Sequence, residues 1–228
     1  PIERQFLTLG GPLGRFHQAM AVEAPVGTTR EKVEEALYRL MGHHDALRLR
    51  VIGGDEASTL DLGLWLDPLG ARVVLDVLDV SGQSREIGEE QIAALLRDLP
   101  GRLDPQDGRM VAGAWVERGA GERSLLLLVI HHLSVDGVSW RVLLEDLASL
   151  TSGASLPGRT HSIRDWSEYL VKEAQAPKRL EEVTTWRSVV SGAGSLPCDA
   201  ALCDADNVIG AVRHYESVLP SADMERLV

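Results

Sequence analysis

The sequence predicts an α/β fold in which a mixed β-sheet is flanked by helices. Segments with apolar residues at helical spacing alternate with short strand-like segments along the chain. The alternation lacks strict βαβ regularity, which favours a mixed sheet over a purely parallel one. Residues 125–130 are all apolar, as in a central strand that is covered on both faces. The length of 228 residues fits one large domain or two small ones.

The first third of the chain supplies a strand, a helix and a second strand. Residues 15–24 form the first strand, between a glycine and a proline. Thr28 and Glu31 have the spacing of a capping box, so the helix is expected to begin after Thr28 and to end at Gly42. Residues 47–52 alternate in polarity and predict a half-buried strand.

The middle of the chain builds most of the expected sheet. A hairpin is indicated where a glycine-containing connection, 118–122, joins two apolar segments. The expected elements are a short strand near 60–66, a strand at 73–80, a helix at 87–99, a turn-rich loop at 102–108, and strands at 110–117 and 124–130.

The last part of the chain is predicted to be mainly helical. Helical spacing favours a helix at 138–150, and a glycine-rich linker at 153–158 separates it from the next elements. The further expectations are helices at 163–175 and 178–190, a surface excursion at 191–210, a strand at 212–219 and a helix that begins at Ser221.

Composition excludes several classes of partner. Acidic residues number 34 and basic residues 23, and the net charge of −11 argues against nucleic-acid binding and anionic-membrane binding, which need a basic face. No apolar run approaches the ~20 residues that span a membrane. The first residues resemble neither a signal nor a transit peptide, so we expect a cytoplasmic location. Cys198 and Cys203 are expected to be unpaired thiols.

The segment His131–Gly137 carries the most chemical information. It lies where the expected central strand ends and a helix begins, and a histidine there can exchange protons near neutral pH. Neighbouring side chains of an extended chain point to opposite sides, so only one of His131 and His132 can face a given cleft. Asp136 could pair with a buried cation, and Gly137 is expected to permit backbone angles that a side chain forbids.

Other chemistries find little support in the same segment. A histidine at a strand end commonly has only a structural role and makes hydrogen bonds there. The residues alone leave this interpretation open for His131 and His132. Zinc binding is disfavoured because His131 and His132 diverge and no further ligand stands at the right spacing. The chain lacks a G-x-S-x-G nucleophile elbow and glycine-rich phosphate loops. We therefore expect no metal site.

Residues 131–147, HHLSVDGVSWRVLLEDL, resemble the H-H-x-x-x-D-G signature of the condensation-domain superfamily of nonribosomal peptide synthetases. This signature is shared with acyltransferases similar to chloramphenicol acetyltransferase. The ending DGVSWR resembles the epimerization branch. Further similar segments are residues 1–6, 43–48, 103–108, 162–170 and 185–186.

The resemblance implies a fold and a domain organisation. Residues 1–210 would form the N-terminal lobe of a fold like that of chloramphenicol acetyltransferase. Residues 211–228 would be the crossover strand and the start of a C-terminal lobe, whose remainder the sequence lacks.

The resemblance also implies roles for single residues. His132 would be the catalytic acid/base, and His131 would pack or orient the loop. Asp136 would be structural, with Arg48 as its partner across the sheet, and Gly137 would serve the turn. Possible contacts to the substrate or its pantetheine arm are Ser134, Ser139 and Trp140.

The implied activity is that of an isomerase that inverts the Cα of an aminoacyl or peptidyl thioester. The substrate would be carried on the phosphopantetheine of a peptidyl carrier protein, and no cofactor would be bound directly. A glutamate of the missing lobe would be the second acid/base, so the 228 residues alone are expected to be inactive.

Two alternatives remain open at this point. A condensation domain would use His132 to join two carrier-bound substrates. A non-catalytic module would only dock a carrier protein.

Overall fold

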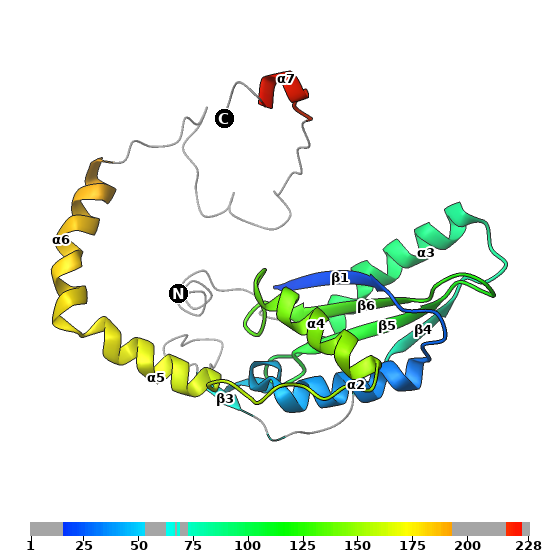
Figure 1. Cartoon of the computed structure of the whole chain (residues 1–228), viewed down its shortest axis with the longest axis horizontal. Helices are drawn as coiled ribbons and strands as arrows, with labels where there is room; N and C mark the ends of the chain where they lie inside the picture. The colour runs from blue at the N-terminus through cyan, green and yellow to red at the C-terminus, as the bar shows by residue number, and fades with distance from the viewer. Residues whose placement is uncertain (1–15, 53–62, 67, 69–72, 193–217, 225–228) are drawn as a thin grey trace. The chain divides into compact units, whose positions relative to one another are not determined.

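A computed structural model describes residues 16–52, 63–66, 68, 73–192 and 218–224 (Figure 1). The chain divides into two units, residues 1–171 and 172–228. The predicted strand at 212–219, the cysteines and the segment resembling the family at residues 1–6 lie wholly or largely outside the described residues. So does the predicted boundary between 210 and 211.

The main sheet has the strand order β1-β6-β5-β4. β1 (His17–Glu23) and β5 (Val111–Glu117) both run antiparallel to β6 (Leu125–His131), whereas β4 (Asp76–Asp79) is parallel to β5. The sheet is therefore mixed, as predicted. A separate antiparallel pair joins β2 (Leu49–Ile52) to β3 (Gly63–Leu66).

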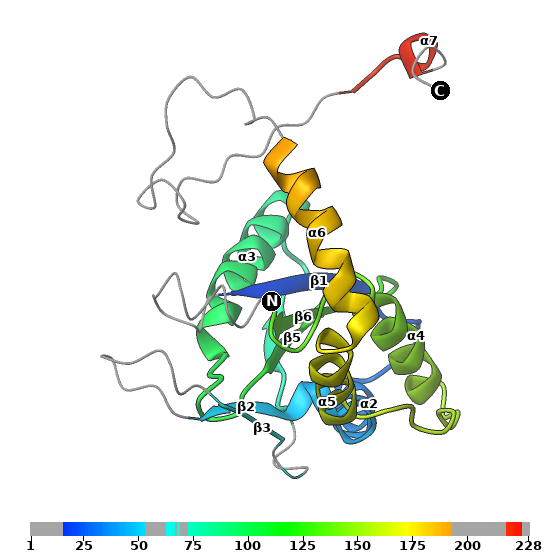
Figure 2. The same ribbon diagram turned by 90° about the vertical axis from the view of Figure 1, so that its left-hand side faces the viewer.

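β6 is the central strand, and every one of its residues is buried. Its alternate side chains enter two separate apolar clusters. Leu126, Leu128 and Ile130 pack on the side of α2 (Arg30–His43) and α4 (Ser139–Thr151). The other face packs against α3 (Arg85–Asp98), so helices cover both faces of the sheet (Figures 1 and 2).

The ends of α2 differ by one residue from the prediction. Thr29, not Thr28, is the N-cap, and its hydroxyl accepts a hydrogen bond from the Lys32 amide at 3.4 Å. The Thr28 amide is already used by a turn, in which it donates to the carbonyl of Pro25 at 3.1 Å. Gly42 lies within the helix and lacks a positive φ, so it does not end the helix.

Several predicted strands are shorter in the structure. A 3-10 turn, η2 (Asp45–Arg48), occupies the start of the strand expected at 47–52. Another, η4 (Leu99–Arg102), extends α3 into the turn-rich loop. The hydrophobic alternation marked burial correctly, since Leu47, Leu49 and Val51 are all buried. Burial alternates in the same way in a 3-10 turn followed by a strand, so the pattern could not separate the two.

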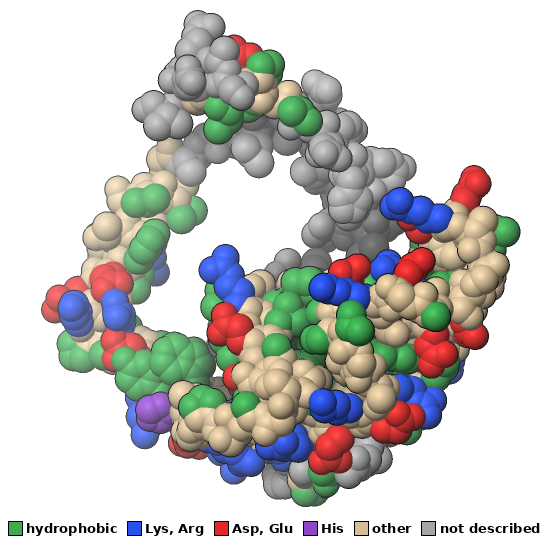
Figure 3. Space-filling model, turned by 45° about the vertical axis from the view of Figure 1, so that its right-hand side comes forward, with side chains coloured by type: hydrophobic (Ala, Val, Ile, Leu, Met, Phe, Trp, Pro, Cys, Tyr) green, Lys and Arg blue, Asp and Glu red, His purple; other side chains and the backbone are tan. Residues whose placement is uncertain are grey.

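The helices at the end of the chain are present but expose apolar side chains. They are α5 (Ile163–Ala174), α6 (Pro177–Gly192) and α7 (Ser221–Met224). Trp166 and Tyr169 of α5 stack with ring centroids 5.4 Å apart, yet each is about half exposed. Figure 3 shows hydrophobic side chains among the charged ones on the surface. Among the described helices, none combines the length and apolar character that crossing a membrane requires.

Candidate active site

The signature segment connects the central strand to α4. β6 ends at His131, a tight turn follows, and α4 begins at Ser139. The segment therefore lies at the junction of strand and helix that the sequence predicted.

His131 and His132 differ sharply in environment. His131 is fully buried, and its Nδ1 accepts a hydrogen bond from the Leu133 amide at 3.2 Å. Its own amide donates at 2.9 Å to the carbonyl of Met110, the residue just before β5. His131 thus packs in the core and anchors the turn, while the half-buried His132 is the residue that can meet a ligand.

The ring of His132 is held from three sides. It stacks on Phe16, with ring centroids 4.6 Å apart and planes inclined by 14°. Its Nδ1 lies 2.8 Å from the carbonyl oxygen of Val135. Its Nε2 lies 3.2 Å from the side-chain nitrogen of Gln18. A carbonyl oxygen only accepts, so Nδ1 carries a proton, and in the neutral ring Nε2 keeps its lone pair.

Asp136 holds the first turn of α4. Its Oδ1 accepts from the amide and the hydroxyl of Ser139, both at 2.7 Å, and from the Val138 amide at 3.0 Å. The Ser139 hydroxyl and then the Ser139 amide hold the pKa of Asp136 below its ordinary value, with the Val138 amide adding to the effect. The carboxylate is exposed, not paired with a buried cation.

The predicted pairing of Arg48 with Asp136 is wrong. The Arg48 Nε donates instead to the carbonyl oxygen of Met41 at 2.9 Å. Because Arg48 lies in η2, directly after α2, its side chain reaches back to that helix. Among the described residues, the polar contacts of the Asp136 carboxylate come from its own loop.

Gly137 lies in the turn, but its predicted conformational role is also wrong. It is not among the described glycines with a positive φ. A Cβ at this position would meet no heavy atom within 4 Å. The turn is held by the hydrogen bonds of Asp136, so it does not require a glycine conformation.

Of the predicted substrate contacts, Ser139 and Trp140 are occupied within the protein. The Ser139 hydroxyl binds Asp136, and the Trp140 Nε1 donates to the Gln18 Oε1 at 2.8 Å. Trp140 is only 4% exposed, so it supports the site from the core. The buried Ser134 hydroxyl has no hydrogen-bond partner among the described residues.

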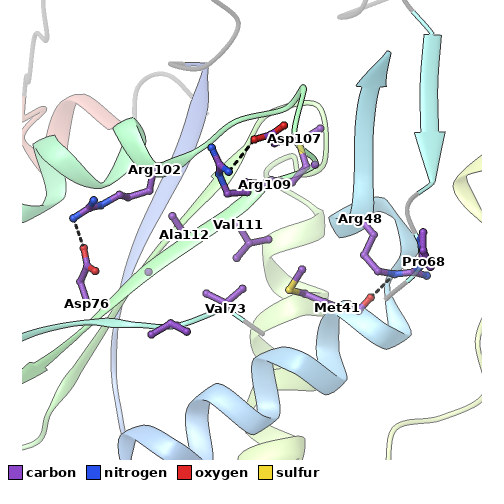
Figure 4. A pocket seen from close by; sticks show the side chains of 14 residues that line it. Met41, Arg48, Pro68, Val73, Asp76, Arg102, Asp107, Arg109, Val111 and Ala112 are labelled. Carbon is purple, nitrogen blue, oxygen red and sulfur yellow. Dashed lines mark hydrogen bonds and ion pairs between the residues drawn. The ribbon is translucent and has the colours of Figure 1, made fainter. Parts of the chain in front are cut away.

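Two cavities lie near these elements. One of about 290 Å³ is lined by Ser134, Asp136 and Ser139, together with His44 and residues of η2 and α4. The other, of about 370 Å³, lies beside β5 (Figure 4). Its Arg102 and Arg109 pair with Asp76 and Asp107, each at 3.0 Å, so its cations are already partnered. Neither cavity is lined by His132.

The structure brings together a polar cluster that the sequence analysis missed. His44 Nε2 lies 2.7 Å from the Asp146 Oδ2 and joins the end of α2 to α4. The possible ligand atoms of His43, His44 and Asp146 lie within 4.8 Å of one another. Burial, then His44 and Arg159, lower the pKa of His43. An arginine beside the cluster disfavours a cation, and the His44–Asp146 contact accounts for the geometry.

Gln18 was also missed. It lies 114 positions from His132 and 122 from Trp140. Its side chain meets them because β1 pairs with β6, in a register that puts Gln18 opposite Ile130. A motif formed by neighbouring residues in the sequence cannot indicate a contact between residues so far apart.

Comparison with known proteins gives a consistent result. Residues 13–210 match the family model described as Condensation domain. Surfactin synthase subunit 2 of Bacillus subtilis is 33% identical over 214 residues, which are 90% of this chain and 6% of that protein. Tyrocidine synthase 1 of Brevibacillus parabrevis is 29% identical over 223 residues, 94% of this chain and 20% of that protein.

Among solved structures, the chain is similar to the epimerization domain from the third module of tyrocidine synthetase B, with 28% identity and a TM-score of 0.72. The match covers 81% of this chain and 42% of that one, so the chain spans less than half of the solved domain. The likeness confirms the predicted α/β lobe of chloramphenicol-acetyltransferase type. The chain belongs to the condensation-domain family.

Proposed function

We propose that the chain contributes the acid/base His132 to an isomerase that inverts the Cα of an aminoacyl or peptidyl thioester in nonribosomal peptide synthesis. The substrate would be held on the phosphopantetheine arm of a peptidyl carrier protein. The observation that carries the proposal is the contact of the His132 Nδ1 with the Val135 carbonyl, because in the neutral ring it leaves the lone pair on Nε2. The likeness to a solved epimerization domain supports the same assignment.

The chemistry follows from this lone pair. Nε2 takes the Cα proton, and the electron pair of the C–H bond moves into the thioester carbonyl to form an enolate. A second acid on the opposite face returns a proton to Cα, and the double bond shifts back to the carbonyl. Because inversion needs two groups on opposite faces, His132 alone is insufficient.

The second group belongs to a lobe that the chain does not span. We expect it to be the glutamate that the family resemblance implies. The cavities beside Ser134 and beside β5 are not lined by His132, so the second lobe would also supply the wall that closes over the ring. No directly bound cofactor and no metal enters this reaction.

Ser134 is proposed as a contact for the pantetheine arm. The arm carries amide groups that need hydrogen-bond partners when water is excluded. The Ser134 hydroxyl is buried, lines the cavity of about 290 Å³ and has no partner among the described residues. It lies two positions from His132, which suits an arm that delivers its thioester to the ring.

The test uses a protein that contains this chain and the second lobe. An L-aminoacyl carrier protein is supplied alone in deuterium oxide, and the chirality and deuterium content of Cα are measured. Epimerization predicts a D/L mixture with deuterium at Cα. The description of the matched family favours condensation as the rival. A peptide formed only when a second loaded carrier is added, with Cα still L and undeuterated, would contradict our proposal.

The non-catalytic alternative is separated by one variant. If the chain only docks a carrier protein, His132→Ala leaves turnover unchanged. If His132 transfers the proton, turnover falls while carrier binding persists.

A further inference from the structure

The orientation of the Gln18 side-chain amide is determined, because its oxygen accepts a hydrogen bond from the indole N–H of Trp140, which can only donate. Trp140 is nearly fully buried, and its indole N–H lies 2.8 Å from the Gln18 Oε1. A buried indole N–H finds a hydrogen-bond acceptor. The amide oxygen of Gln18 therefore faces Trp140, and its NH2 group faces the other way.

The NH2 group of Gln18 contacts His132, the proposed catalytic base. It lies 3.2 Å from the His132 Nε2, and an amide nitrogen only donates. The Nε2 must therefore accept, which is the same protonation state that the Val135 carbonyl requires at Nδ1. The Val135 carbonyl requires a proton on Nδ1 and the Gln18 amide requires a lone pair on Nε2, so the two contacts agree on one neutral tautomer.

The three groups come from three elements that pack together. Gln18 lies on β1, His132 follows β6 and Trp140 begins the buried stripe of α4. Gln18 pairs with Ile130, a residue of the apolar cluster that also contains Trp140. The packing of α4 on the sheet therefore brings together this relay, the chain of contacts from the Trp140 indole through the Gln18 amide to the His132 imidazole.

We propose that Gln18 is a positioning residue for His132, held by Trp140, which orients the ring and keeps the proton off Nε2. This inference rests on the proposed function, in which Nε2 is the atom that takes the Cα proton. The contact at 3.2 Å is at the long end of hydrogen-bond lengths, so it yields when substrate approaches. Until then the amide holds the lone pair in place and excludes the Nε2–H tautomer.

The sharpest variant is Gln18→Glu. It preserves the size of the side chain and the acceptor for Trp140, but it places a carboxylate oxygen where the NH2 group stood. Both ring nitrogens of His132 then face acceptors, so the ring is expected to carry two protons. Trp140→Phe is the complementary variant, because it removes the indole N–H and leaves the amide free to rotate.

The first readout is the nitrogen NMR spectrum of the chain labelled with ¹⁵N-histidine, recorded at the lowest pH at which the parent His132 ring is neutral, with His132 assigned by its loss in His132→Ala. We expect a protonated Nδ1 and an unprotonated Nε2 in the parent chain, and a protonated Nε2 in Gln18→Glu. Gln106→Glu, which adds the same charge at an exposed glutamine, is expected to leave the His132 signals unchanged. An unprotonated Nε2 in Gln18→Glu would overturn the inference.

The second readout is Cα deuterium exchange in the protein that contains both lobes. We expect kcat to fall at least tenfold in Gln18→Glu with KM little changed, and Trp140→Phe to lower kcat by a smaller factor. Equal rates for Gln18→Glu and Gln106→Glu would refute the positioning role. If the NMR result holds but the parent protein catalyses no exchange, the relay stands and the proposed function fails.

Discussion

Replacing Asp136 by alanine removes the acceptor that holds the first turn of α4. Three hydrogen bonds are lost, from the Ser139 amide and hydroxyl at 2.7 Å and from the Val138 amide at 3.0 Å. The carboxylate is exposed, so water replaces part of each bond, and the cost is that of losing a helix N-cap, about 0.5–2 kcal/mol. Because several donors lose one acceptor, we expect the free energy of unfolding to fall by about 1–2 kcal/mol.

Urea unfolding followed by tryptophan fluorescence measures this loss. The matched control is Glu145→Ala, which removes an exposed carboxylate of the same helix that makes no side-chain hydrogen bond to another described residue. It is expected to change stability by less than about 0.5 kcal/mol. Equal effects of Asp136→Ala and Glu145→Ala would refute the assignment of Asp136 to the helix start.

The pH dependence gives an independent check. Hydrogen bonds from Ser139 hold the pKa of Asp136 below its ordinary value, so the native state favours the ionised form. This stabilisation is complete above the unfolded-state pKa of about 4 and is lost as pH falls through the lower folded-state pKa. The stability difference between the parent chain and Asp136→Ala should therefore shrink on acidification below about pH 4. A difference that grows would contradict the argument.

Three further predictions use the same unfolding assay. A Cβ on Gly113 would lie 2.8 Å from a leucine methyl and 2.9 Å from a backbone oxygen of β6, so Gly113→Ala should cost about 1–3 kcal/mol, while Gly137→Ala should be nearly neutral. Thr29→Ala should cost about 0.5–1 kcal/mol and Thr28→Ala less, because only Thr29 caps α2; the reverse order would restore the predicted cap. His44→Ala should lower the free energy of unfolding by about 1–2 kcal/mol, because it removes the His44 ring that lies 2.7 Å from the Asp146 carboxylate of α4. An unchanged stability would show that this contact does not stabilise the fold.

The parts of the fold that the sequence predicted well are those determined by burial. The apolar run at 125–130 indicated a strand covered on both faces, and its residues divide between two clusters on opposite sides of the sheet. The same reasoning placed the turn at His131–Gly137 between a strand and a helix. In each case one hydrophobic surface had to be covered, and the pattern left little choice.

The parts that it predicted poorly depend on competition between local hydrogen bonds. Thr28 and Thr29 are both good caps, and it is the Thr29 hydroxyl that accepts from the Lys32 amide, while Thr28 belongs to the preceding turn. Asp136 was expected to pair with Arg48, but its carboxylate accepts hydrogen bonds from donors in its own loop. Such choices are settled by distances of a few ångströms, which a linear pattern does not contain.

The support of His132 lay beyond prediction for a different reason. Gln18 and Trp140 reach the ring only because β1 pairs with β6 and α4 packs on the same face. Neither residue type in its local context distinguishes a relay from an ordinary polar or buried side chain. Only the strand register makes the contact visible.

Loss of Cα deuterium exchange on replacing His132 tests the account most directly. A protein containing this chain and the second lobe is incubated with an aminoacyl carrier protein in deuterium oxide, and the initial rate of deuterium incorporation is compared with that of His132→Ala. Removing a general acid/base typically costs about 10²–10⁴-fold, so incorporation should fall at least a hundredfold while carrier binding is retained. Incorporation at the parent rate in the folded variant would show that another group moves the proton.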